Sequence, residues 1–76
     1  MKPIITTNHE IYCKHRNGNL SVLNVEIEEY KNVYVAHIVD NSFLLRTIRF
    51  AKCAKHTRKF IVEYMYSVAQ RYNYFN

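Results

Sequence analysis

The sequence predicts an α+β fold, in which a three- to four-stranded antiparallel sheet is packed by one long C-terminal helix. Turn residues divide the first two thirds of the chain into short, β-branched segments, which is typical of hairpins. The last third instead repeats its apolar residues at helical spacing, with no Gly or Pro to interrupt it. With 76 residues, the chain is expected to form a single domain, 1–76.

The first hairpin is predicted from a turn signal at Asn17-Gly18, because both positions of a tight turn need a positive φ. Residues 10–16 read as the strand before this turn and residues 19–28 as the strand after it. A turn of two residues would place Tyr12 opposite Leu23.

The strand over 19–28 changes its apolar face near residue 22. Leu23, Val25 and Ile27 alternate on one face, whereas Leu20 and Val22 lie on the other. A β-bulge and a strongly twisted edge are two explanations for the change, and the sequence does not choose between them.

Two further hairpins are expected at 28–32 and 40–42, which are polar segments rich in turn formers. Between them, residues 33–39 form the most apolar segment and are predicted to be a central strand. Residues 43–49 are interpreted as a fourth strand, although a pair of helices joined by a kink is the alternative.

One long helix over 51–73 is predicted from a single apolar stripe. Extending this stripe back through 43–49 would bury Arg46 and expose Leu44, Leu45 and Ile48, so the helix is not expected to begin earlier. About 23 residues of helix would span roughly 35 Å and overhang the sheet. The stripe comprises Phe50, Cys53, Ala54, Thr57, Ile61, Tyr64, Met65, Val68, Tyr72 and Phe75.

Basic residues concentrate between 46 and 59, a stretch with no acid in a chain of net charge +5. On the expected helix, Lys52, Lys55 and Lys59 share the face opposite the apolar stripe, near the positive end of the helix dipole. A bound phosphate would offset the repulsion between these lysines and the dipole. The alternative without a ligand is a solvated face that favours solubility. The candidate nucleic-acid-binding residues are Arg46, Arg49, Lys52, Lys55, His56, Arg58 and Lys59.

The leading hypothesis is therefore a small, basic, non-enzymatic protein that binds DNA or RNA through this strand and helix segment. Its element order is similar to several small nucleic-acid-binding modules in which a helix packs across an antiparallel sheet. The acids Glu26, Glu28 and Glu29 are expected on a hairpin tip away from the basic stretch.

The alternative is a protein-interaction module, such as a small regulator or inhibitor, that binds an acidic protein through an aromatic helix face. A core this small also makes a homodimer an expected form. The candidate partner or dimer contacts are Val62, Tyr66, Tyr72, Tyr74 and Phe75.

Metal binding and catalysis are not expected. Cys13, His15, Cys53 and His56 lack the spacing of a standard zinc finger, so free thiols and surface histidines are predicted, with no metal or cofactor. No Gly-rich phosphate loop, nucleophile elbow or carboxylate pair is present. A small ribonuclease using His15, His37 or His56 is the residual enzyme hypothesis, although His37 is predicted to be a core histidine.

A cytoplasmic location is expected. No apolar run is long enough to span a membrane, the N-terminus lacks the apolar segment of a signal peptide, and two cysteines fit a reducing compartment. The abundance of Asn and Tyr is typical of AT-rich genomes, including those of many bacteria and phages.

Overall fold

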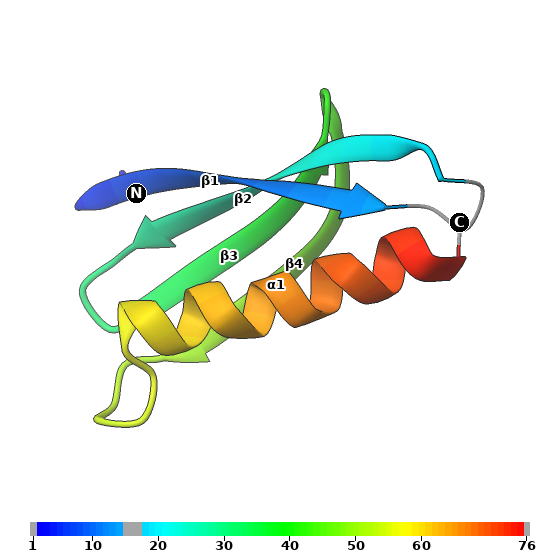
Figure 1. Cartoon of the computed structure of the whole chain (residues 1–76). Coiled ribbons are helices and arrows are strands. Elements are labelled where there is room, and N and C mark those ends of the chain that lie inside the picture. Colours follow the sequence, from blue (N-terminus) through cyan, green and yellow to red (C-terminus); the bar gives the residue numbers. More distant parts are fainter. Residues whose placement is uncertain (1, 15–17, 76) are drawn as a thin grey trace.

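Four strands and one helix make up the computed structural model, which describes residues 2–14 and 18–75. They follow in the order β1 (Ile5–Lys14), β2 (Leu20–Glu29), β3 (Val33–Asp40), β4 (Phe43–Ala51) and α1 (Arg58–Phe75). The strands form one antiparallel sheet in the order β1-β2-β3-β4, and α1 crosses one of its faces (Figure 1). This confirms the predicted α+β class and the interpretation of 43–49 as a strand.

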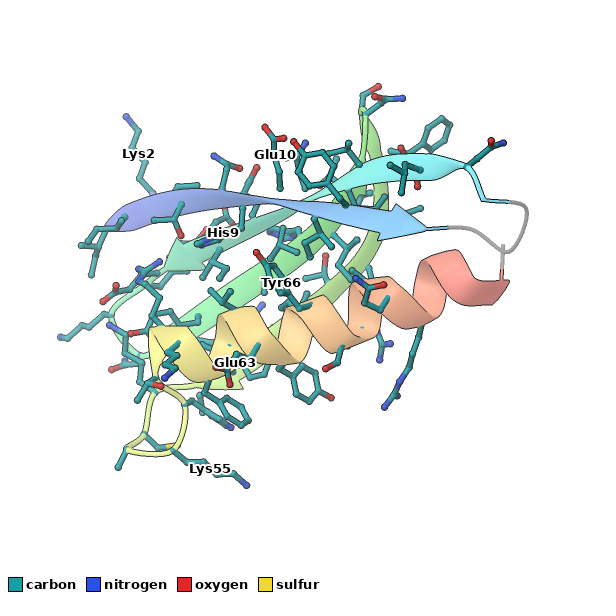
Figure 2. All side chains as sticks on the ribbon, viewed as in Figure 1. Lys2, His9, Glu10, Lys55, Glu63 and Tyr66 are labelled. Carbon is teal, nitrogen blue, oxygen red and sulfur yellow. The ribbon has the colours of Figure 1, made fainter. Side chains whose placement is uncertain are left out.

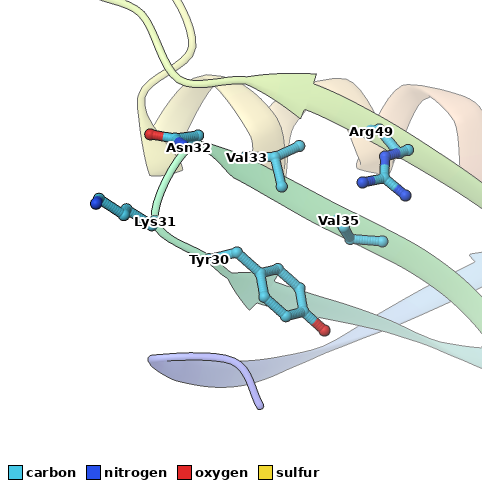
Figure 3. A pocket seen from close by; sticks show the side chains of 6 residues that line it. All are labelled: Tyr30, Lys31, Asn32, Val33, Val35 and Arg49. Carbon is cyan, nitrogen blue, oxygen red and sulfur yellow. The ribbon is translucent and has the colours of Figure 1, made fainter. Parts of the chain in front are cut away.

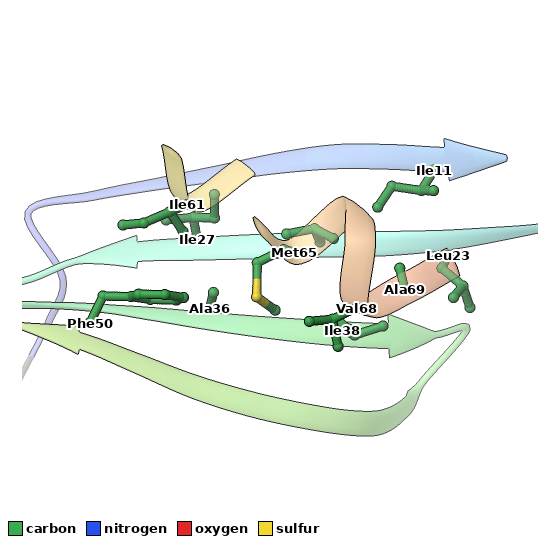
Figure 4. Packing of buried hydrophobic residues seen from close by; sticks show 11 residues of the cluster. Ile11, Leu23, Ile27, Ala36, Ile38, Phe50, Ile61, Met65, Val68 and Ala69 are labelled. Carbon is green, nitrogen blue, oxygen red and sulfur yellow. The ribbon is translucent and has the colours of Figure 1, made fainter. Parts of the chain in front are cut away.

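The core lies between α1 and one face of the sheet (Figure 4). Alternate residues of β2 point toward the helix, as the period of two requires, and α1 packs mainly on β1, β2 and β3. The opposite face, named here the open face, carries no helix from the described part of the chain. The buried cluster is Ile11, Leu23, Val25, Ile27, Ala36, Ile38, Phe50, Ile61, Met65, Val68 and Ala69.

The first hairpin forms as predicted, but its register differs by one residue. Tyr12 lies opposite Val22, and Ile11 takes the place opposite Leu23. The two strands end at Lys14 and Leu20, so the connection over 15–19 is longer than a two-residue turn. Gly18 has a φ of 88°, in the region that favours glycine, while Asn17 lies outside the described residues. The shift buries Ile11 and leaves Tyr12 on the open face.

The apolar face changes near residue 22 because Leu20 and Val22 lie on the open face, where they are exposed. Leu20 and Val22 are 69% and 41% exposed, respectively. The β1–β2 pairing runs without a register shift; the shift in the sheet lies instead between Ile38 and Val39, opposite β4. The bulge suggested for the first hairpin is therefore wrong.

The predicted start of the helix at residue 51 is wrong, because α1 begins at Arg58. β4 continues to Ala51, which lies opposite Val33. Residues 50–51 are therefore extended and paired in the sheet, so they cannot belong to the helix. Thr57 then caps the helix. The Phe60 amide donates to Thr57 Oγ1 at 3.1 Å, which satisfies a backbone donor that the first turn would leave unpaired.

The predicted apolar stripe holds only in part and only within α1, where Tyr64 is 43% exposed. Ile61, Met65 and Val68 are buried, but Cys53, Ala54 and Thr57 are exposed in and beside the loop at 52–57. The side chains of Tyr72 and Phe75 lie outside the described residues.

The expected overhang of the helix does not occur. With 18 residues, α1 is roughly 27 Å long. That matches strands of 8–10 residues, which span roughly 26–34 Å. No helix in the described part of the chain is long and apolar enough to cross a membrane.

Candidate functional site

One end of the sheet collects positively charged side chains. β2 and β4 both run antiparallel to β3, so their C-terminal ends meet there, beside the start of β1 and the N-terminus of α1 (Figure 1). Backbone contacts join these segments: the Ile4 amide donates to the Glu29 carbonyl at 2.6 Å, and the Lys52 amide donates to the Asn32 carbonyl at 3.1 Å. We name this region the basic end, after its cations Lys2, Lys31, Lys52, Lys55, Arg58 and Lys59.

Glu29 holds two of these cations. Its carboxylate oxygens lie 2.7 Å from Lys52 Nζ and 2.7 Å from Arg58 Nη2. Arg58 Nη1 also donates to Thr7 Oγ1 at 2.8 Å, so the network joins β1, β2, the loop and α1. Hydrogen bonds from Lys52 and then Arg58 lower the pKa of Glu29. Glu29 therefore lies among the basic residues, contrary to the expectation that it stands apart from them.

The remaining cations of the basic end point to solvent. Lys31 in the β2–β3 turn, Lys55 in the loop and Lys59 in the first turn of α1 are exposed and form no ion pair within residues 2–14 and 18–75. Figure 2 shows the Lys55 side chain extending from the loop. Only Lys59 belongs to the helix, so the predicted helical row of Lys52, Lys55 and Lys59 is wrong. Three separate segments supply the exposed charge instead.

Arg46 and Arg49 lie on opposite faces of the sheet. Arg46 pairs with Ile38, which is buried under the helix, and Arg49 pairs with Val35 on the open face. Arg46 is five positions before the end of β4 at Ala51, which places it roughly 17 Å from the basic end. Only Arg49 is close enough to act together with the basic end.

A pocket of about 520 Å³ opens on the open face beside the basic end (Figure 3). Partial burial raises the pKa of Tyr30, as does the nearby Glu28 carboxylate, while the Arg49 charge acts in the opposite direction. The sequence predicts 28–32 only as a polar turn, so this pocket was not expected. The lining residues are Tyr30, Lys31, Asn32, Val33, Val35 and Arg49.

His56 is part of the loop structure. Its Nδ1 lies 2.8 Å from the Ala51 carbonyl oxygen, which can only accept, so Nδ1 carries the proton. Its ring lies 5.4 Å from each of the rings of Phe50 and Phe60. Tyr64 extends this cluster, with its ring 5.5 Å from that of Phe50. His56 is thus held by the backbone and by aromatic neighbours rather than presented to solvent.

The predicted partner contacts on the helix do not form one described surface. Val62 is half-buried and packs against the core, whereas Tyr66 is 40% exposed (Figure 2). The side chains of Tyr72, Tyr74 and Phe75 lie outside the described residues. Tyr66 is therefore the one residue of this set that the described structure leaves open to a partner.

The cysteines lie at opposite ends of the sheet. Cys13 pairs with Ser21 near the end of β1, whereas Cys53 is exposed in the loop at the basic end. A separation of this kind spans most of a strand, roughly 25–30 Å. The two Cys-His pairs therefore cannot form one zinc site, and His15 lies outside the described residues.

The prediction that His37 is a core histidine is wrong, because His37 lies on the open face. Its Nε2 is 2.8 Å from Glu28 Oε1, and its Nδ1 is 2.8 Å from Thr47 Oγ1. Ligand atoms of Glu26, Glu28 and His37 lie within 4.8 Å of one another, so the three could hold a divalent cation. Both ring nitrogens of His37 already have partners, however, so His37 needs no cation to satisfy them.

Comparisons of the chain with protein families, with curated proteins and with solved structures found no match.

Proposed function

We propose that this protein is a non-enzymatic nucleic-acid-binding protein that holds phosphates with the exposed cations of its basic end. The observation that carries the proposal is that three segments of the basic end each supply an exposed lysine, Lys31, Lys55 and Lys59, while the Glu29 carboxylate is paired with Lys52 and Arg58. Glu63 is an exposed acid one helical turn after Lys59, and the exposed lysines outnumber it. An excess of exposed lysines is the electrostatic footprint that a phosphate backbone requires.

The position of α1 supports an anionic ligand. The first turn of the helix contains no acidic residue, yet it carries Arg58 and Lys59 at the positive end of the helix dipole. Thr57 satisfies one backbone donor of that turn. A phosphate near Lys59 would be attracted by both the side chain and the dipole.

The structure changes the residues assigned to this role. Lys31, Lys55 and Lys59 make up the proposed phosphate contacts, with Arg49 beside them on the open face. Lys52 and Arg58 hold Glu29 instead, and His56 holds the Ala51 carbonyl. Arg46 is directed to the helix side of the sheet, and no role in binding is proposed for it.

Fluorescence anisotropy with a labelled single strand and with a duplex of equal length tests this proposal. Binding at about 50 mM salt should weaken steeply as salt rises, because each phosphate contact releases counterions. The slope of log K against log salt gives the number of contacts, at about 0.7 per phosphate for a single strand. Absence of binding to both probes at the low salt concentration would refute the proposal.

A second candidate is contact with an acidic protein in the cytoplasm. The exposed rings of Tyr64 and Tyr66, 43% and 40% accessible on α1, favour it, because tyrosine is enriched at protein interfaces. Here Tyr66→Ala should weaken the complex more than Lys55→Ala, and the reverse order would exclude it.

A homodimer through α1 is part of this candidate. Light scattering on a chromatography column, with and without nucleic acid at two salt concentrations, measures the mass of each species. A dimer mass that persists in high salt supports the homodimer, and a monomer mass throughout contradicts it.

A further inference from the structure

The pocket beside the basic end is lined by residues from three segments of the chain. The β2–β3 turn supplies Tyr30, β3 supplies Val33 and Val35, and β4 supplies Arg49 (Figure 3). Val35 is only 8% exposed although it points to the open face. The Tyr30 ring and the Arg49 side chain flank it, so this part of the open face is partly enclosed.

The lining combines an apolar surface with fixed positive charge. The Tyr30 ring and the two valines offer a surface for a flat, weakly polar group. Lys31 and Arg49 lie at the same opening and would attract an anion attached to that group, and Asn32 adds an amide that both donates and accepts. A volume of about 520 Å³ is within the ordinary range for small-ligand sites, about 300–1,000 Å³.

We propose that this pocket receives one unpaired base of a single-stranded nucleic acid. The base lies against the Tyr30 ring, and a phosphate beside it is held by Arg49 or Lys31. This inference rests on the proposed function, because the same strand would continue onto Lys55 and Lys59. It predicts a preference for single strands, since the bases of a duplex are stacked and paired and cannot enter.

The charges around the pocket are compatible with this ligand. Two acids of β2 act on Tyr30: Glu28, whose carboxylate is engaged by His37 Nε2 at 2.8 Å, and, less strongly, Glu26. Arg49 has no ion pair among the described residues, so its guanidinium is available to a phosphate. Because Arg46 lies on the opposite face of the same strand, it offers a matched control for Arg49.

Direct evidence for stacking would come from Tyr30→Trp. The chain contains no Trp, so the substituted residue would be the only indole, and a base stacked on it should quench its emission. An abasic oligomer of equal length supplies the phosphates without bases. Anisotropy of the labelled strand, measured on the same samples, shows when the protein is saturated. Oligothymidylate and oligouridylate would be compared, to separate DNA from RNA.

Saturating oligothymidylate or oligouridylate should quench Tyr30→Trp strongly, and the abasic oligomer should quench it little. Tyr66→Trp, on α1, should respond little to either probe, because its exposed ring lies outside the pocket. Equal emission from Tyr30→Trp with and without saturating strand, or equal quenching by the abasic oligomer, would overturn the inference.

Affinity measurements give a second readout. Base stacking on an aromatic ring contributes about 1–3 kcal/mol, so Tyr30→Leu should weaken single-strand binding by about 5- to 150-fold and leave duplex binding unchanged. Arg49→Gln should weaken single-strand binding more than Arg46→Gln does. Circular dichroism of each variant confirms that it is folded before affinities are compared.

The outcomes separate the two proposals. Binding that prefers single strands and is lost with Tyr30→Leu supports both. If the wild-type protein binds nucleic acid but Tyr30→Leu binds equally well, or loses single-strand and duplex binding together, the pocket does not hold a base and the basic end alone remains. If the wild-type protein binds neither form, both proposals fail.

Discussion

Lys52 and Glu29 are 23 residues apart in the chain, yet Lys52 Nζ lies 2.7 Å from Glu29 Oε2. Arg58 reaches the other oxygen of the same carboxylate. The basic stretch at 46–59 therefore has two kinds of cation: those that hold the fold together and those that face solvent. Function is proposed only for the second kind.

Replacing Glu29 tests this division. Glu29→Gln removes both ion pairs, so the midpoint of urea unfolding at neutral pH should fall. It also frees Lys52 and Arg58, so nucleic-acid binding at low salt should become tighter although the fold is less stable. Glu63→Gln on α1 is the control for stability: it changes the net charge equally but disrupts no ion pair in the described structure. Equal unfolding midpoints for the two variants would contradict the assignment.

Acid should weaken the wild-type fold through the same network. Lys52 and Arg58 lower the pKa of Glu29 in the folded state below its ordinary value of 4.5. Stability from a lowered pKa is fully present above the unfolded value and is lost as pH falls through the folded value. Urea unfolding of the wild type should therefore show a loss of stability below about pH 4.5 that is smaller in Glu29→Gln. Parallel pH profiles for the two proteins would exclude Glu29 as the cause.

Thr57 should contribute to stability as the helix cap. Thr57→Ala removes the acceptor for the Phe60 amide and should cost about 1 kcal/mol, which lowers Tm by about 4–8 °C in a domain of this size. Ser67→Ala is a control in the same helix. Its hydroxyl donates to the Glu63 carbonyl within an already bonded turn, and alanine is the better helix former. A loss for Ser67→Ala as large as for Thr57→Ala would argue against a capping role.

His9 offers a stabilising substitution. Its Nε2 is buried and has no hydrogen-bond partner among residues 2–14 and 18–75 (Figure 2). An unpaired buried polar atom is destabilising, so His9→Leu should raise the free energy of unfolding by about 1 kcal/mol. His37→Leu should do the opposite, because it removes contacts to Glu28 and Thr47. Thermal unfolding of both variants checks the sign of each change, and a lower Tm for His9→Leu would contradict the prediction.

The strand pattern was predictable because it depends on local features. Polar turns at 28–32 and 40–42 separate β-branched segments. A helix that began before residue 50 would place Arg46 on the apolar stripe, and this argument correctly excluded such a helix. The helix start was missed because Thr57 fits two roles, a member of an apolar stripe and an N-cap. Only the sheet pairing of Phe50 and Ala51 decides between them.

The candidate site was harder to predict, because it depends on which strand ends meet. Arg46 and Arg49 are three residues apart, and this spacing in a strand already places them on opposite faces. Glu29 and Lys52 meet because β2 and β4 run in the same direction in a four-stranded meander. Lys31 was overlooked because it is a single lysine in a turn, distant in sequence from the basic stretch.

Two pairs of substitutions, measured as the salt dependence of single-strand binding, test the central claim most directly. Lys55→Gln with Lys59→Gln and Arg46→Gln with Arg71→Gln each remove two exposed positive charges, the first pair from the basic end and the second from elsewhere. The first pair should make the slope of log K against log salt shallower by about 1.4, which is two phosphate contacts, and the second pair should leave it nearly unchanged. Equal slopes for the two variants would show that net charge, and not the basic end, determines binding.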